Sequence, residues 1–378
     1  MRLSPWFTAC LVFAGVLSAR VTAESQPATR PAPDLRAERT WLLRQFDQRA
    51  ASRVAEALSQ PADNTAGGIA WGHSYLMSAL AEMLHATGDS RYAALFVRLG
   101  TWVADGRDDR HQRRDEVRGK VLPAWGSSKY SDGKWYVWAV HTGMIAAPMA
   151  RFGAAVNEHP RLRERFKADA GRFTAIAREA LGAHADQFRP GPADGEGHLY
   201  GYWLKRGLPL NQQNAPARAW IWLADVAGDR AVLDEPTHLA TFLKNRLRLT
   251  EDGAYVWGYW PPLDGPGEAF EDISHAAINA DFIVLCAENG IVFGQQDVDR
   301  VAKTFLTRVM PEPNKVANDL AGRGVAKYPY APFMWGRLAR HDTAVRDRLL
   351  EYAHTRIDDK SAPNTFLVGL VHLVAATR

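Results

Sequence analysis

Chemistry-bearing side chains crowd into positions 255–281, where a loop leads into an apolar helix. Prolines and glycines between positions 261 and 267 keep the loop from being helical. Glu271, His275 and Asn279 then follow at four-residue spacing, which predicts a carboxylate, an imidazole and an amide on one helix face. The alternative is an ordinary helix start capped by Glu271 or Asp272, with His275 in solvent. The loop is preceded by flat aromatic faces suited to stacking on sugar rings: Tyr255, Trp257, Tyr259 and Trp260.

Positions 200–214 place a row of amides at a predicted helix start, shortly after three aromatic residues. Capping would explain each amide on its own. Amides beside aromatic rings can also hydrogen-bond carboxylates and sugar hydroxyls, so we predict that this segment contacts substrate. The aromatic residues are Tyr200, Tyr202 and Trp203, and the amides are Asn211, Gln212, Gln213 and Asn214.

A third cluster lies between Gly322 and Tyr330. Arg323 is flanked by glycines, so it can approach a ligand closely and bind a carboxylate with two hydrogen bonds. Tyr328 or Tyr330 could then transfer a proton. The alternative is a plain surface turn before the next helix.

These residue types suit β-elimination on a polyuronate. In that reaction a base removes the C5 proton beside the uronate carboxylate, and the glycosidic bond at O4 breaks. The proton is very weakly acidic unless Asn, Arg, His or a protonated Glu neutralises the carboxylate. A Tyr or His within reach of C5 can serve as the base, and Arg323 and His275 would lower the pKa of a neighbouring Tyr. The predicted set is Asn211, Asn214, Glu271, His275 and Arg323, with Tyr328 or Tyr330.

Helical periodicity covers most of the chain and predicts about twelve helices, with no alternating strand run. Gly88-Asp89 and Gly228-Asp229 are short turns between consecutive helices. Repeated antiparallel pairs predict an all-α (α/α)6–7 toroid, with a superhelical solenoid as the alternative. Binding residues concentrate on long loops, which should gather at one rim. The long loops are 105–135, 188–210, 250–270 and 311–332.

The N-terminus predicts an exported protein, periplasmic or secreted. Residues 1–23 resemble a signal peptide, 24–37 form a Pro-rich tether expected to be disordered, and 38–378 form one catalytic domain. Without the leader only Cys286 remains, so no intrachain disulfide is expected.

Composition and motifs exclude several functional classes. Hydrophobic residues make up 47% and charged residues 23% of the chain, which is ordinary globular composition. The sequence has no His-Glu-x-x-His, Walker loop or Gly-x-Ser-x-Gly motif. Acidic residues interrupt the basic run 107–118, which argues against a nucleic-acid surface. We expect no metal or cofactor and no membrane partner after leader removal. The sequence leaves the oligomeric state open.

Three short motifs resemble α/α-toroid polysaccharide lyases, closest to the family of glucuronan lyases and alginate (polymannuronate) lyases. They are Leu-Pro-x-Asn-Gln at 208–212, Trp-x-Tyr at 257–259 and Glu-Asp-Ile-Ser-His-Ala at 271–276, and the resemblance runs from about Ala70 to the C-terminus. It implies that an amide and an acid neutralise the carboxylate while a Tyr acts as base and acid. The matching residues are Asn211 or Asn214, Glu271 with Glu268 as its rival, His275, Arg323, and Tyr328 with Tyr330, Tyr259 and Tyr255 as rivals.

We therefore expect a metal-independent lyase that cleaves β-1,4-linked glucuronan or polymannuronate, with an anionic polysaccharide as its partner. An inverting glycoside hydrolase would need two carboxylates about 6.5–9.5 Å apart. A non-catalytic glycan-binding protein would use the aromatic residues alone, and an epimerase would begin with the same C5 proton abstraction. Candidate carboxylates for the hydrolase are Asp264, Glu268, Glu271, Asp272 and Asp281.

Overall fold

The structure is a computed structural model that describes residues 34–262 and 270–378. The predicted leader, most of the predicted tether, and Asp264 and Glu268 lie outside the described residues. The carboxylate of Asp34 accepts hydrogen bonds from the N–H groups of Arg36 and Ala37, which caps the first helix. That helix begins at Leu35, so residues 35–37 are helical rather than part of a disordered tether.

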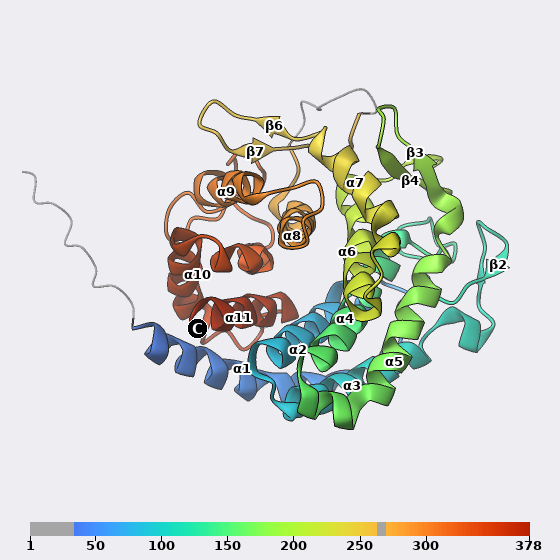
Figure 1. Cartoon of the computed structure of the whole chain (residues 1–378), viewed down its shortest axis with the longest axis horizontal. Helices are drawn as coiled ribbons and strands as arrows, with labels where there is room; N and C mark the ends of the chain where they lie inside the picture. Colours follow the sequence, from blue (N-terminus) through green and yellow to red (C-terminus); the bar gives the residue numbers. More distant parts are fainter. Residues whose placement is uncertain (1–33, 263–269) are drawn as a thin grey trace, which may run out of the picture. The chain divides into compact units, whose positions relative to one another are not determined.

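Two rings of helices build the unit 34–378, and the described residues contribute six helical elements to the inner ring (Figure 1). Each inner element packs against the next along the chain, and α11 closes the ring by packing against α2. The inner elements are α2 (Ser74–Thr87), α4 (Ala139–Glu158), α6 (Leu210–Ala227), α8 (Ile273–Glu288), the 3₁₀ helix η6 (Ala331–Arg340) and α11 (Asn364–Ala376).

An outer helix covers each inner element, so the predicted α/α toroid is confirmed with six pairs in the described chain. In the order of the inner elements above, the covering helices are α3, α5, α7, α9, α10 and α1. Their bounds are α1 (Leu35–Leu58), α3 (Ser90–Asp105), α5 (Pro160–Gly182), α7 (Asp234–Lys244), α9 (Gln295–Thr304) and α10 (Thr343–Arg356).

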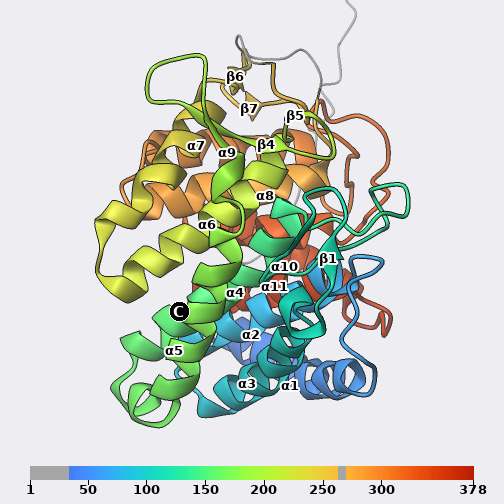
Figure 2. The same cartoon turned by 90° about the vertical axis from the view of Figure 1, so that its right-hand side faces the viewer.

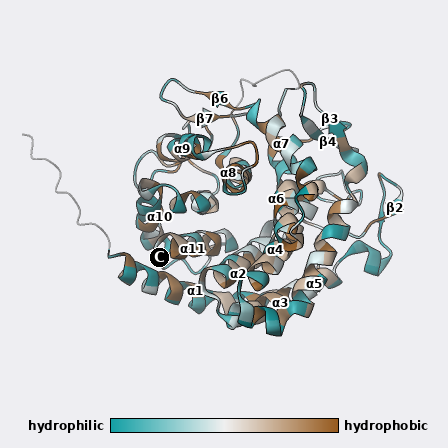
Figure 3. Ribbon diagram, viewed as in Figure 1, coloured by the Kyte–Doolittle hydropathy of each residue, from teal (hydrophilic) through white to brown (hydrophobic). Residues whose placement is uncertain are grey.

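Helices of the inner ring are more completely buried than helices of the outer ring. Every residue of α4 from Ala139 to Val156 is buried, because both its neighbours in the ring and α5 cover it. By contrast, α5 buries one stripe that includes Phe166 and Phe173. Figure 3 shows the same contrast, with α4 and α6 mostly white to brown and α1 carrying teal along its length. Gly143 lets α4 approach α6 closely, since a Cβ there would lie 2.2 Å from the backbone nitrogen of Pro216.

Short turns join the helices at one end of the ring, as predicted. Gly88 and Gly228 adopt left-handed conformations, with φ of 68° and 62°, and end α2 and α6. Asp89 then caps α3 and Asp229 caps the next short helix. The long loops precede the inner helices. In Figure 2 the loop that carries β1 lies on the right, and the strands β6 and β7 lie at the top.

The long loops contain short strands, which corrects the expectation of no strands. In β4 the side chains alternate between buried and half-buried, but glycines at both ends and a length of five residues hide the pattern in the sequence. The antiparallel pairs are β1–β2, β3–β4–β5 and β6–β7. The strands are β1 (Arg114–Asp115), β2 (Lys120–Val121), β3 (Phe188–Pro190), β4 (Gly197–Gly201), β5 (Arg206–Gly207), β6 (Arg248–Leu249) and β7 (Tyr255–Val256).

Short helical segments complete the described chain. Two are single π-helical turns, a form that is rare outside functional or strained positions. The π-helical turns are η1 (Ile69–His73) and η5 (Phe305–Val309). The short 3₁₀ helices are η2 (Asp108–His111), η3 (Ala185–Gln187) and η4 (Arg230–Leu233).

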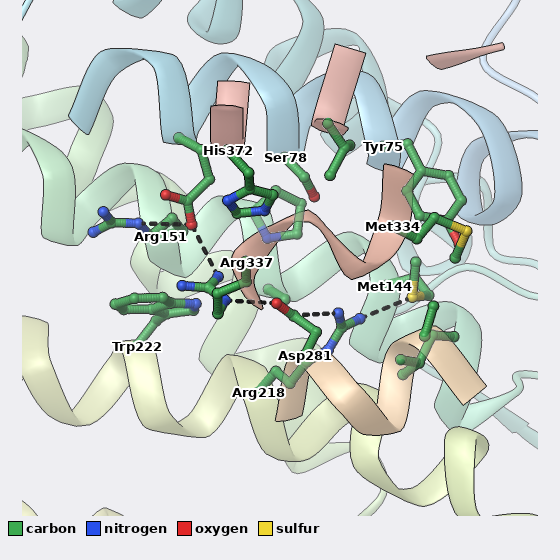
Figure 4. A pocket seen from close by; sticks show the side chains of 16 residues that line it. Tyr75, Ser78, Met144, Arg151, Arg218, Trp222, Asp281, Met334, Arg337 and His372 are labelled. Carbon is green, nitrogen blue, oxygen red and sulfur yellow. Dashed lines mark hydrogen bonds and ion pairs between the residues drawn. The ribbon is translucent and has the colours of Figure 1, made fainter. Parts of the chain in front are cut away.

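A layer of paired charges fills the inner ring near the short-turn end (Figure 4). Arg337 donates to Glu82, Asp281 and Glu288 at N–O distances of 3.1, 2.6 and 3.2 Å. Burial alone would raise the pKa values of these acids, but the surrounding arginines outweigh it and lower them, to about 2 for Asp281 and Glu288. These three carboxylates are therefore ionised around the Arg337 guanidinium.

Candidate active site

A cavity of about 760 Å³ lies at the opposite end, where the inner helices begin. Partial positive charge at helix N-termini favours a bound anion. Each inner element contributes at least one residue to the wall, and the long loops supply the rest. One such wall residue from the first turn of each inner element is, in chain order, Tyr75, His141, Gln212, His275, Ala331 and Thr365.

His275 is held in the wall by the residue that caps α8. The Asp272 carboxylate accepts hydrogen bonds from the N–H groups of Ser274 and His275 and pairs with His275 Nδ1. Although burial opposes ionisation, the hydrogen bonds from His275 and Ser274 lower the pKa of Asp272 to about 2. Asp272 is therefore ionised and Nδ1–H must donate to it. This leaves Nε2 as the ring nitrogen available to accept a proton.

Tyr259 lies beside His275, with 5.1 Å between the ring centroids. Its hydroxyl accepts a hydrogen bond from Gln212 Nε2 at 3.1 Å. Burial raises the pKa of Tyr259 to about 12, so the hydroxyl keeps its proton at neutral pH and can donate it. Imidazole and phenol thus form an acceptor and a donor in one part of the cavity.

Two other tyrosines of the wall differ in solvent exposure and in the hydrogen bonding of their hydroxyls. Tyr328 is 67% exposed at the mouth. Tyr330 is nearly buried and its hydroxyl donates to Asp359, and burial together with that carboxylate raises its pKa. The Tyr330 hydroxyl is thus committed to a structural bond, whereas the Tyr328 ring can meet a ligand. The proton-transfer role predicted for Tyr328 stays a prediction.

Sequence reasoning missed most of the wall, including Lys129, Tyr130, Trp138 and His141. Tyr130 is 46% exposed, and its ring lies 5.9 Å from the His141 ring. Trp138 and His141 lie at the start of a helix after the long loop 105–135, and that position was the available clue. The helix that follows is mostly apolar, so its own sequence gives no sign of a binding site.

Glu271 and Asn214 lie behind the wall. Glu271 is fully buried and accepts hydrogen bonds from Trp257 Nε1 and Asn279 Nδ2, while Asn279 Oδ1 accepts from Asn214 Nδ2 at 2.7 Å. Burial raises the pKa of Glu271 well above its usual value. The three-residue helix face predicted for Glu271, His275 and Asn279 therefore divides, because Glu271 and Asn279 point into the protein and His275 faces the cavity.

We expect Glu271→Gln to keep this neutral network and remove a pH dependence. Because folding raises the pKa of Glu271, the folded state holds the proton more tightly than the unfolded chain. Wild-type stability should therefore fall as pH rises above the unfolded pKa of about 4.3. Urea unfolding at several pH values should show the loss for wild type and less of it for Glu271→Gln. Glu271→Ala, which strands two buried donors, should be less stable than Glu271→Gln by about 1–3 kcal/mol at every pH, because neither variant titrates at this position. Equal pH slopes for wild type and Glu271→Gln would contradict a neutral Glu271.

Other predicted site residues do not line the cavity. Asn211 and Trp257 are each 1% exposed. Arg323 is exposed, but its guanidinium donates to Asp319 at 2.8 Å and lies over the Phe270 ring.

The predicted aromatic group 200–203 lies along the β4–β5 hairpin, and none of its three rings lines the cavity. Tyr202 donates its hydroxyl to the carbonyl of Asp186, and its ring meets that of Tyr200 edge-on. Trp203 lies beneath the ammonium of Lys134. Of the predicted residues, the structure therefore brings Gln212, Tyr259, Trp260, His275, Tyr328 and Tyr330 together around the cavity.

The cavity wall formed by the described residues contains no carboxylate. It offers two histidines, one lysine, five tyrosines and three tryptophans. Together with the helix N-termini, this wall provides hydrogen-bond donors and partial positive charge.

No protein-family model and no curated protein matches the sequence. Solved structures do match. A cellobiose 2-epimerase from Spirochaeta thermophila aligns with a TM-score of 0.59 and 11% identity over 93% of this chain and 99% of that one. An unsaturated glucuronyl hydrolase specific for heparin aligns at 0.55 and 10%, over 89% and 96%. The α-1,6-mannanase of Salegentibacter sp. HEL1_6 aligns at 0.52 and 12%, over 88% and 98%.

The likeness is one of fold. All three neighbours are named for activities on carbohydrates, and the α/α toroid is the architecture they share with this chain.

The described residues contain no group of three or more His, Cys, Asp or Glu placed to hold a metal ion. None of their helices is long and apolar enough to cross a bilayer.

Proposed function

We propose that this protein is an exported lyase that cleaves a β-1,4-linked polyuronate, glucuronan or polymannuronate, by β-elimination. The observation that carries the proposal is the wall itself. An oriented imidazole and a protonated phenol lie side by side in a cavity with donors and no described carboxylate. Carboxylates would repel a uronate, whereas helix N-termini and Lys129 would attract it.

The residues support a proton path in which every bond is accounted for. His275 Nε2 takes the C5 proton while Asp272 stabilises the imidazolium that forms. The electron pair of the C5–H bond forms the C4–C5 double bond, and the C4–O bond breaks. Tyr259, next to His275, donates its proton to the leaving oxygen and regains one from the imidazolium. Enzyme groups thus return to their starting states.

A glycoside hydrolase remains the second candidate because two of the neighbours carry hydrolase names. An inverting hydrolase needs a carboxylic acid and a carboxylate across the scissile bond. Of the carboxylates considered for that role, Glu271 and Asp281 are committed to buried networks and Asp272 holds His275. Asp264 and Glu268 lie outside the described residues.

The test is ultraviolet absorbance of the conjugated double bond while purified protein meets glucuronan, polymannuronate, polyguluronate and hyaluronan in parallel, with EDTA present. We expect absorbance to rise on glucuronan or polymannuronate. Reducing ends without absorbance on any polymer would favour the hydrolase. Solvent deuterium at C5 without cleavage would favour an epimerase. No change of any kind would reject the lyase.

A further inference from the structure

Three side chains of the cavity wall carry a buried polar atom that has no hydrogen-bond partner among the described residues. They are Trp138 Nε1, His141 Nε2 and Gln212 Oε1. An unpaired buried polar group is costly, so such groups are rare in folded proteins unless a ligand completes them. Two of these atoms belong to Trp138 and His141, which both lie at the start of α4.

Trp138 and His141 present their rings at one place on the wall. Trp138 caps α4 and His141 follows three residues later, so the two lie on the same face of the first turn. Tyr130 meets both rings edge-on, at centroid distances of 6.4 Å and 5.9 Å. Trp138 is 4% exposed and His141 is fully buried. The free helix N–H groups of α4 add partial positive charge at the same point.

Asn64 determines which nitrogen of His141 carries the proton. Its Oδ1 accepts from the N–H of Ala70, and its Nδ2 donates to the carbonyls of Trp125 and Gly126. The amide orientation is therefore fixed, and Nδ2 also faces His141 Nδ1 at 3.4 Å. Since Nδ2 is a donor, Nδ1 must accept, and the proton resides on Nε2.

His141 stays neutral over the working range of pH. Burial lowers its pKa to about 3. Its Nε2–H is therefore a permanent donor, like the indole N–H of Trp138. A pair of neutral donors strengthens as a ligand oxygen gains negative charge, and it adds no charge that water must solvate in the empty site.

We propose that Trp138 Nε1–H and His141 Nε2–H together bind the substrate carboxylate, which makes the first turn of α4 the uronate-binding subsite. Naming a uronate rests on the proposed function. Tyr130 covers the donors in the unliganded protein, and its exposed side chain rotates aside when the carboxylate enters. Gln212 Oε1 then accepts a hydroxyl of the same sugar. The pair takes over the neutralising role that the sequence suggested for Asn211, Glu271 and Arg323.

Calorimetric binding of D-glucuronate and D-glucose tests this pair without requiring turnover. His141→Phe and Trp138→Phe each keep a ring and remove the N–H, so each should weaken glucuronate binding about tenfold or more and leave glucose binding unchanged. His141→Gln retains a neutral donor and should recover part of the affinity. His73→Phe is the control, because His73 Nδ1 is also buried and unpartnered but its ring faces Trp102, away from the cavity.

The result is read separately from the lyase assay. Folded His141→Phe and Trp138→Phe proteins that bind glucuronate as tightly as wild type would overturn the pair. Wild-type protein that binds glucuronate no better than glucose would overturn it too. If the donors are needed for glucuronate binding and no unsaturated product forms on any polymer, the subsite stands and the lyase proposal fails.

Discussion

His275→Ala is expected to lower kcat on the cleaved polyuronate by about 10²–10⁴-fold, the usual contribution of a positioned general base. The physical reason is the arrangement around the ring: Asp272 holds Nδ1, and Nε2 faces the cavity beside Tyr259. Affinity for the polymer should change much less, because helix N-termini and the donors on α4 remain. Initial rates from the ultraviolet absorbance of the product, combined with binding measurements, would separate the two effects.

His354→Ala is the matched control for this experiment. His354 also pairs with a carboxylate, that of Glu38, and its side chain is 41% exposed, as is that of His275. It lies on α10 in the outer ring, so its removal should leave kcat unchanged. Full activity of His275→Ala would assign the base to another residue, with Tyr328 and Tyr259 as the next candidates. Loss of activity with retained binding would exclude a protein that only binds glycans.

Arg337→Met is expected to produce the largest loss of stability, about 3–5 kcal/mol in the free energy of unfolding at neutral pH. The Arg337 side chain is 5% exposed and contacts three carboxylates. Those of Glu82 and Asp281 are also well buried. Removing the guanidinium leaves negative charge that the neighbouring arginines only partly compensate. Urea unfolding followed by circular dichroism measures the loss.

The free energies of unfolding of wild type and Arg337→Met should become similar at low pH. Folding lowers the pKa values of Glu82, Asp281 and Glu288, so their stabilising contribution is present above the unfolded values of about 4 and disappears as pH falls towards about 2. The difference between wild type and Arg337→Met should therefore shrink below about pH 4. Lys315→Met, which breaks an exposed pair with Glu312, should change stability little at any pH. A constant difference down to the lowest pH would mean that Arg337 acts through packing and not through charge.

The sequence determined the helices and their turns, because the patterns that specify them are local. The turns predicted at Gly88-Asp89 and Gly228-Asp229 end α2 and α6, and each aspartate caps the helix that follows. Apolar spacing, a left-handed glycine and an aspartate cap each act within a few residues, so no distant contact is needed to read them. The alternation of short turns and long loops also predicted that the long loops precede the inner helices at one end of the ring.

Tertiary structure decided which polar residues reach the cavity. Glu271 and His275 lie four residues apart, yet Glu271 precedes the Asp272 cap and is buried against Trp257 and Asn279, while His275 lines the cavity from the first turn of α8. His141 belongs to a helix that is buried along most of its length. Only the closed ring brings Asn64 and Tyr130, which are far from it in the sequence or in another element, into contact with its imidazole. These outcomes depend on contacts between residues far apart in the chain. A local pattern shows which residues share a face but not what covers that face once the ring has closed.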